Sequence, residues 1–271
     1  MKYGLVALDI DGTLLDSNGE LSARVRRTIK AVIDRGVMVT LATGRRISST
    51  LPWAKALGIE IPLVVHNGAV IVCPKTEKIQ LQKGIPVTIA QQIHTDLLKR
   101  KVPHLVYKGE DHGDTGYLPT EFNSRSRALF LEYIDDHIQN VEQVYFSEPV
   151  IKISALGETK QIMAYLEQWQ ADYGQDTSLT IYNSVDYSGV DFIPPTCSKA
   201  TGIKHVAEQL GLSIEQVVAI GDQANDLEMI KAAGLGIAMY NAPQEVKEVA
   251  KYVTSSNDQD GVAQALEDIF L

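Results

Sequence analysis

Two carboxylates, Asp9 and Asp11, follow an apolar run near the start of the chain. The apolar run, residues 3–8, has the pattern of a central parallel strand that is covered on both faces. Carboxylates at the end of such a strand are costly unless something neutralises or uses them. In an open α/β sheet, ligands bind at this end of the strands. The pattern therefore indicates a site that holds a cation and acts on an anion.

Further polar residues follow other apolar runs of the chain. Because the carboxyl ends of parallel strands share one edge of a sheet, we expect all of these loops to converge. The residues are Thr43, Gly44 and Arg45 after the run 37–42, Asp222, Asn225 and Asp226 after the run 217–221, and Lys199 near the start of a predicted helix.

The residue types favour the transfer of a phosphoryl group. Asp9 and Asp222 have the oxygen ligands that Mg²⁺ prefers. The Thr43 hydroxyl, the Gly44 N–H and the Lys199 ammonium suit the oxygens of a phosphoryl group. Asp9 is then placed to attack phosphorus as a nucleophile. Asp11, two residues further on, is a candidate general acid and base for the leaving group and the attacking water.

The elements that must position these residues alternate between strand and helix at both ends of the chain. This alternation predicts an α/β fold with a parallel sheet and right-handed crossovers. The middle of the chain mixes strand-like and helix-like pieces in another order, which predicts an inserted α+β domain. We expect residues 1–84 and 189–271 to form the core, with the run 190–195 leading into the lysine-bearing helix, and residues 85–188 to form the insertion.

Composition narrows the class of partner. The chain has 271 residues, a net charge of −9 and two cysteines, Cys73 and Cys197, which form no metal-binding or redox motif. No basic stripe predicts a nucleic-acid partner, and no apolar stretch is long enough to predict a membrane span. We expect a cytoplasmic protein with reduced thiols, a monomer or a small homo-oligomer.

Four segments resemble the motifs of the haloacid dehalogenase superfamily: "DIDGTLLD", "ATGR", "SKATGI" and "GDQANDLEM". The resemblance is specific because the four occur in the same order and with similar spacing, and it covers essentially the whole chain. The long insertion resembles the large cap of the Cof-type sugar-phosphatase branch. The resemblance implies a Rossmann-like core with an inserted α+β cap domain.

The resemblance also implies a role for each matching residue. Asp9 corresponds to the nucleophile and a Mg²⁺ ligand, Asp11 to the general acid/base with a main-chain carbonyl on the metal, and Asp222 to the remaining protein ligand. Asp226 would position Lys199 or a metal-bound water. The residues implied to bind phosphate are Ile10 (through its N–H), Thr43, Gly44, Lys199 and Asn225. Separately from the resemblance, we expect Arg45 to contact substrate and Asn67 to support the site.

The favoured function is a Mg²⁺-dependent phosphatase that acts on small phosphorylated metabolites, in particular sugar phosphates. A phosphomutase or phosphotransferase would use the same phospho-aspartate and differ only in the acceptor that the cap admits. A phospho-acceptor switch would also use Asp, Thr and Lys at strand ends, but it would not need the large insertion or Asp11. A dehalogenase is disfavoured, because it would leave Asp11, Asp222 and Lys199 unexplained as a set.

Overall fold

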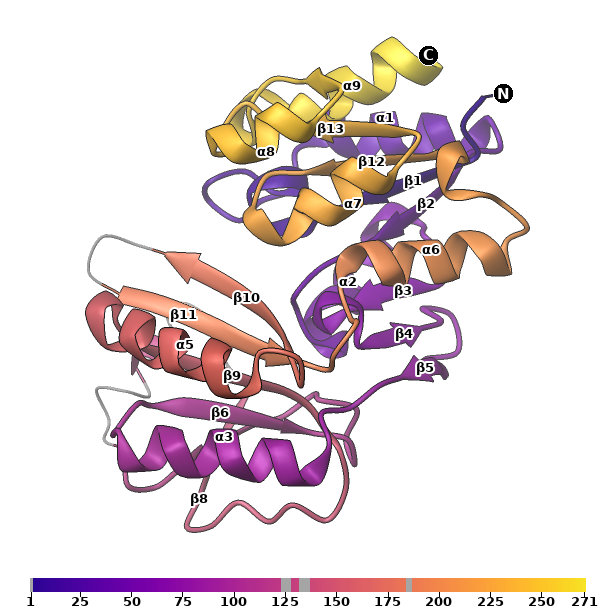
Figure 1. The fold of residues 1–271 in the computed structure, drawn as a ribbon. Coiled ribbons are helices and arrows are strands. Elements are labelled where there is room, and N and C mark those ends of the chain that lie inside the picture. Colours follow the sequence, from indigo (N-terminus) through magenta and orange to yellow (C-terminus); the bar gives the residue numbers. More distant parts are fainter. Residues whose placement is uncertain (1, 123–127, 132–136, 184–186) are drawn as a thin grey trace. The chain divides into compact units, whose positions relative to one another are not determined.

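The computed structural model of the chain describes residues 2–122, 128–131, 137–183 and 187–271. Two compact units make up the chain (Figure 1). The first consists of residues 1–81 and 198–271, and the second of residues 82–197. The first unit is therefore assembled from two distant parts of the chain, with the second unit inserted between them.

A five-stranded parallel sheet forms the centre of the first unit, in the order β14-β13-β12-β1-β2. β1 pairs with a neighbour on each side, and all four of its residues are buried. This confirms the predicted α/β class with a parallel sheet. The strands are β1 (Leu5–Leu8), β2 (Met38–Leu41), β12 (Val217–Gly221), β13 (Leu235–Ala238) and β14 (Tyr252–Val253).

Helices cover both faces of this sheet (Figure 1). α1 (Ala23–Asp34) and α9 (Gly261–Phe270) lie together on one face, and α6 (Lys199–Gln209), α7 (Leu227–Ala232) and α8 (Gln244–Val249) lie on the other. Leu5 and Ala7 belong to the same apolar cluster as side chains of α6, α7 and α8. Alternation along the strand sends Val6 and Leu8 to the opposite face. Burial on both faces explains why β1 is apolar throughout.

A smaller three-stranded sheet continues the first unit, in the order β3-β4-β5. Its strands are β3 (Leu63–Val65), β4 (Val70–Val72) and β5 (Ile79–Gln82), and α2 (Ile47–Leu57) connects β2 to β3. A parallel bridge between Ala42 and Val64 places β3 beside the end of β2. The short turn η2 (His66–Gly68) between β3 and β4 therefore lies next to the loop that follows β2.

A six-stranded sheet forms the second unit, in the order β10-β11-β9-β6-β7-β8. All its described pairings are antiparallel except β7 with β8. α3 (Val87–Lys99) and α5 (Thr159–Tyr173) pack on it through an apolar cluster that includes Trp169 and Phe192. The strands are β6 (His104–Lys108), β7 (Gly116–Pro119), β8 (Ile138–Val141), β9 (Val150–Glu158), β10 (Ser178–Asn183) and β11 (Tyr187–Ile193).

The second boundary of the insertion differs from the predicted one, which followed residue 188. The run 190–195 is mostly apolar and precedes the helix that carries Lys199, which predicts a place in the core. In the structure most of that run belongs to β11, where Val190 lies opposite both Ile181 of β10 and Ala155 of β9. Its hydrogen bonds therefore hold it in the second unit, which continues to Cys197.

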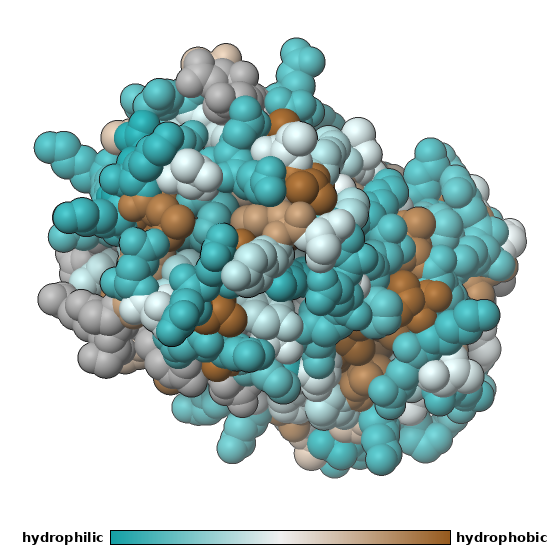
Figure 2. All heavy atoms as spheres, turned by 90° about the horizontal axis from the view of Figure 1, so that it is seen from below, coloured by the Kyte–Doolittle hydropathy of each residue, from teal (hydrophilic) through white to brown (hydrophobic). Residues whose placement is uncertain are grey.

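Hydrophilic residues prevail on the face shown in Figure 2, where apolar residues form separate small groups. Single exposed apolar side chains, such as Tyr145 and Tyr240, are ordinary on protein surfaces. The expected monomer or small homo-oligomer stays a prediction. Among the described residues, every helix is too short or too polar to cross a membrane.

Candidate active site

Polar side chains gather at the carboxyl edge of the parallel sheet in the first unit. Asp9 follows β1, Thr43 follows β2 and Asp222 follows β12. The Asp9 N–H donates to the Ile220 carbonyl oxygen at 3.0 Å, so the pairing of β1 with β12 extends to the acidic residue. This edge is where ligands bind in open α/β sheets.

Lys199 is the first residue of α6 and is only 2% exposed. The start of the helix is secured by a capping box between Ser198 and Thr201. Lys199 Nζ donates to Asp9 Oδ1 at 2.6 Å and to Asp226 Oδ1 at 2.7 Å. Burial alone would lower the pKa of Lys199, but the carboxylates of Asp226 and Asp9 raise it. The ammonium is therefore a fixed positive charge beside Asp9.

Asp226 uses both of its carboxylate oxygens within the protein. It ends the short turn η4 (Ala224–Asp226), where Oδ1 accepts from Lys199 and Oδ2 accepts from the N–H groups of Asp222 and Gln223, both at 2.9 Å. A Cβ at position 221 would lie 2.5 Å from Asp226 Cγ, so glycine is required there. These contacts suit Asp226 to the positioning of Lys199 and of the loop that carries Asp222.

Asp222 is held against the loop that follows β1. Its Oδ1 accepts from the Thr13 hydroxyl at 2.7 Å and its Oδ2 from Gln223 Nε2 at 3.2 Å. Gly12 has φ +76°, and a Cβ there would lie 2.4 Å from Asp222 Oδ2. Burial raises the pKa of Asp222 to about 6, against the opposing hydrogen bond from Thr13. A cation bound at this carboxylate would lower the pKa again.

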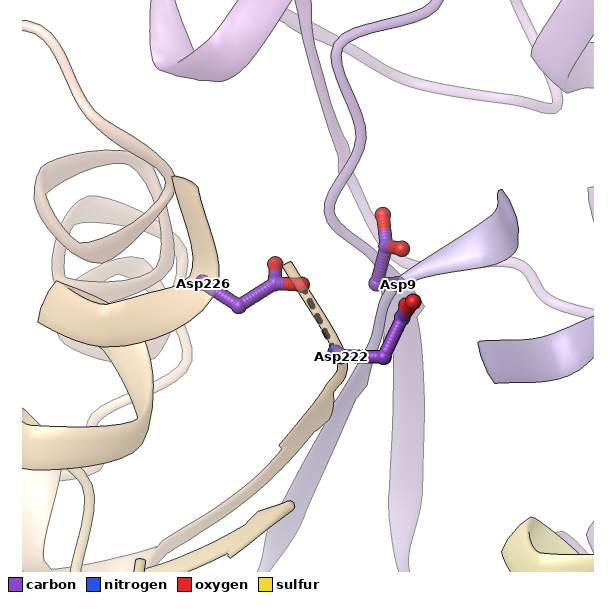
Figure 3. Close-up of side chains that lie close together, drawn as sticks. All are labelled: Asp9, Asp222 and Asp226. Carbon is purple, nitrogen blue, oxygen red and sulfur yellow. Dashed lines mark hydrogen bonds between the residues drawn. The ribbon is translucent and has the colours of Figure 1, made fainter. Parts of the chain in front are cut away.

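The donor set fits a divalent cation. Figure 3 shows the side chains of Asp9, Asp222 and Asp226 close together, and one oxygen of each lies within 4.8 Å of the others. Burial raises the pKa of Asp9 well above its ordinary value, and the ion pair with Lys199 opposes this rise. Three buried carboxylates and one ammonium leave excess negative charge within this group of four residues, which a divalent cation would neutralise. Asp9 and Asp222 are the better ligands, because Asp226 binds the Lys199 ammonium and two backbone N–H groups, whereas Asp222 accepts from neutral side chains.

Hydrogen bonds join three loops of the predicted site. Two of them contain the predicted phosphate-binding residues Thr43 and Asn225, and the third contains Asn67, which is predicted to support the site. Thr43 is 1% exposed; its hydroxyl accepts from the Arg45 N–H at 3.1 Å, and its carbonyl oxygen accepts from the Asn67 N–H at 2.9 Å. Asn67 Oδ1 in turn accepts from Asn225 Nδ2 at 3.0 Å. The structure thus brings Thr43, Asn67 and Asn225 together, while Ile10 and Gly44 adjoin Asp9 and Thr43 in the chain.

Asp11 lies outside the buried group. Its side chain is 61% exposed and receives two hydrogen bonds from the Arg45 guanidinium, with Arg45 Nε 2.8 Å from Asp11 Oδ2. Such a two-point contact between a guanidinium and a carboxylate defines the direction of both side chains. The structure therefore pairs Asp11 with Arg45, a contact that the sequence did not predict.

Two further residues contact the site without having been singled out from the sequence. Thr13 binds Asp222 across a separation of 209 residues, for which no local pattern exists. Asn241 follows β13 at the same edge of the sheet and donates from Nδ2 to the Gly12 carbonyl oxygen at 2.8 Å. Asn241 follows an apolar run just as Asp9 does, so the sequence contains a signal for its place at this edge.

Comparisons with known proteins match the chain over nearly all of its length. A family model described as haloacid dehalogenase-like hydrolase matches residues 6–266. The stress response protein YhaX of Bacillus subtilis is 33% identical over 281 residues, covering 100% of this chain and 94% of that protein. The 5-amino-6-(5-phospho-D-ribitylamino)uracil phosphatase YcsE of the same organism is 29% identical, covering 97% and 94%. A solved haloacid dehalogenase-like hydrolase from Bacteroides thetaiotaomicron has a TM-score of 0.83 at 28% identity, covering 99% and 100%.

Proposed function

The chain belongs to the haloacid dehalogenase-like hydrolase family and is a hydrolase of phosphoric monoesters, and from this premise we propose that it is a Mg²⁺-dependent phosphatase with Asp9 as nucleophile. The observation that carries the proposal is the buried pair of Asp9 and Lys199 beside Asp222, at the ligand-binding edge of the sheet. A carboxylate for attack, a fixed cation and a second carboxylate for a metal are the parts that such a reaction needs.

In the proposed first step, an Asp9 carboxylate oxygen attacks phosphorus and the bond from phosphorus to the leaving oxygen breaks. Lys199, the Thr43 hydroxyl and the Asn225 amide hold the phosphoryl oxygens, with the N–H groups of Ile10 and Gly44. Bound Mg²⁺, held by Asp9, Asp222 and the Asp11 carbonyl oxygen, would neutralise charge between the Asp9 carboxylate and the phosphate. The product of this step is an alcohol and a phospho-aspartate at Asp9.

Asp11 is proposed to move the proton in both steps. It donates a proton to the leaving oxygen, and then takes one from the water that attacks phosphorus and restores the Asp9 carboxylate. In the structure Asp11 is paired with Arg45. Hydrogen bonds of catalytic groups often form only once the substrate is bound, so this pairing is compatible with the role. Arg45 would then be released to contact the substrate.

The proposed substrates are small phosphorylated metabolites, in particular sugar phosphates. The name of YcsE describes a phosphatase for a compound with a phosphorylated ribityl chain, a polyhydroxylated phosphate ester. We also propose a cytoplasmic location; both cysteines are unpaired thiols, as a reducing compartment would keep them.

The test replaces the nucleophile and keeps the shape of the site. We expect Asp9→Asn to lower Mg²⁺-dependent turnover of p-nitrophenyl phosphate by at least about 1,000-fold, since an amide cannot form the intermediate. Asp34→Asn, at an exposed residue paired with Lys30, is the matched control. Metal-dependent turnover that survives in Asp9→Asn would overturn the proposal. A panel of sugar phosphates and polyol phosphates, assayed with Mg²⁺ and with EDTA, then tests the substrate class.

A further inference from the structure

Asn67 occupies a backbone conformation that few residues tolerate. It lies in η2 with φ +52°, and its side chain is among the most buried polar groups, with the residue 1% exposed. Asn is one of the residue types that enter the left-handed region most readily, because its short amide bonds locally. A buried amide on such a turn needs partners. Asn67 Oδ1 contacts the loop of Asn225, and the backbone N–H of Asn67 contacts the loop of Thr43.

The turn η2 touches every loop to which the proposed function assigns phosphate contacts through a side chain. The Asn67 N–H donates to the Thr43 carbonyl oxygen at 2.9 Å, and Asn67 Oδ1 accepts from Asn225 Nδ2 at 3.0 Å. At Gly68, with φ +89°, a Cβ would lie 2.1 Å from the carbonyl oxygen of Ser198, the residue that caps the helix of Lys199. Thr43, Asn225 and Lys199 therefore all stand on segments that contact this one turn.

The contact with Asn67 also determines the orientation of the Asn225 side-chain amide, that is, which positions its N–H groups and its oxygen occupy. Asn225 Nδ2 carries two N–H bonds, and Asn67 Oδ1 takes one of them. Asn225 Oδ1 is buried and, among the residues that the structure describes, meets no hydrogen-bond donor. The contact with Asn67 is thus the one that opposes rotation of the amide. After a half turn Asn225 would present its oxygen, an acceptor, where its N–H had been, and an acceptor repels a phosphoryl oxygen.

We infer that Asn67 is a positioning residue for phosphate, which orients the Asn225 amide so that its N–H faces the anion. The inference rests on the proposed function, because that function assigns Asn225 to the phosphoryl group. Removal of the Asn67 side chain would then have the same effect as removal of the Asn225 side chain. The effect would fall on the affinity for phosphate more than on the stability of the fold.

The experiment is a double-mutant cycle with inorganic phosphate as the probe. Asn67→Gly deletes the amide while it keeps a residue suited to φ +52°. We expect Asn67→Gly and Asn225→Ala each to raise the inhibition constant of inorganic phosphate about 10-fold, as for one hydrogen bond to a charged group, and the double variant to be no worse than either. Asn18→Gly, in an exposed turn, is the matched control.

Asn67 would not act through Asn225 if the inhibition constant in the double variant rose by the product of the two single effects. The same would follow if Asn67→Gly left the inhibition constant unchanged. If Asn67→Gly does not fold by circular dichroism, the cycle is run with Asn67→Asp, which keeps an acceptor for Asn225. In the Asn67→Asp protein, Asn225→Ala must still raise the inhibition constant of inorganic phosphate about 10-fold. An increase of less than about twofold would overturn the inference. A wild-type protein that hydrolyses no phosphate ester would instead overturn the proposed function.

Discussion

Lys199 stands at the first position of α6, where the helix dipole disfavours a cation. Its burial between Asp9 and Asp226 offsets this disadvantage, because both carboxylates would otherwise be buried without a counter-charge. The same arrangement keeps the ammonium next to the proposed nucleophile. The residue is therefore expected to matter for the stability of the protein as well as for its activity.

We predict that Lys199→Met lowers the free energy of unfolding at pH 7 by about 3–5 kcal/mol, since it leaves two carboxylates uncompensated. Without the Lys199 cation, nothing opposes the rise that burial causes in the pKa of Asp9, so the folded variant gains stability from protonation of Asp9 as the pH falls. The difference in the free energy of unfolding between Lys199→Met and the wild type should therefore be smaller at pH 5 than at pH 7. Urea unfolding in EDTA at both pH values measures it, with Lys204→Met, at an exposed lysine of the same helix, as control. A deficit that does not change with pH would contradict this account.

The residues of the site could be predicted as far as they follow strands. Asp9, Thr43 and Asp222 each succeed an apolar run, and their convergence follows from the parallel sheet. Hydrogen-bond partners could not be predicted in this way. The contact of Thr13 with Asp222 and that of Arg45 with Asp11 depend on how separate loops pack, and a sequence pattern contains no information about such distances.

At the scale of elements, α3 and β6 meet through two histidines. His94 Nδ1 lies 2.8 Å from His104 Nε2, and His104 Nδ1 lies 2.9 Å from the Val102 carbonyl oxygen. The carbonyl can only accept, so His104 Nδ1 carries a proton and its Nε2 accepts from His94. The ring of Phe146 packs on His94 and that of Phe122 on His104. Burial lowers the pKa of His104 to about 3 and that of His94 to about 4.

We predict that the second unit loses stability between pH 7 and pH 5. In the unfolded chain each histidine binds a proton near pH 6.5, whereas in the folded unit both stay neutral, so acid favours unfolding. His104 should contribute a loss of about 2 kcal/mol over this range, and His94, which is less buried and better solvated, a smaller loss. His94→Gln, which removes one of the two titrating rings, should therefore lose less stability than the wild type between pH 7 and pH 5. Urea unfolding at both pH values tests this, with His112→Gln as the exposed control. Equal losses in His94→Gln and the wild type would contradict the prediction.

The elements of the first unit could be predicted more closely than the end of the insertion. β1 depends on the pattern of neighbouring residues, and it agrees with the sequence. β11 does not: its apolar run would suit a strand in either unit. Only its pairing with β9 and β10 decides the matter, and those partners are distant in the chain.

At the scale of the whole molecule, each unit has its own apolar core and its own tryptophan. Trp53 lies in α2 of the first unit, and Trp169 is buried in the core of the second. The two are the only tryptophans of the chain. All three carboxylates of the acidic group, Asp9, Asp222 and Asp226, belong to the first unit. A ligand of these carboxylates should therefore stabilise one unit directly, and the tryptophans can report on each unit separately.

We predict that Mg²⁺ raises the unfolding midpoint reported by Trp53 and leaves that reported by Trp169 nearly unchanged. Trp169→Phe isolates the first signal and Trp53→Phe the second. At 100 times its dissociation constant, a cation that binds only the folded unit adds about 2.7 kcal/mol. Asp222→Asn, which removes a proposed ligand, should abolish most of the shift. Equal shifts in the midpoints reported by Trp53 and Trp169 would mean that the two units unfold in one cooperative transition, because Mg²⁺ bound to the first unit would then also stabilise the second. No shift in either would count against a cation at Asp9 and Asp222.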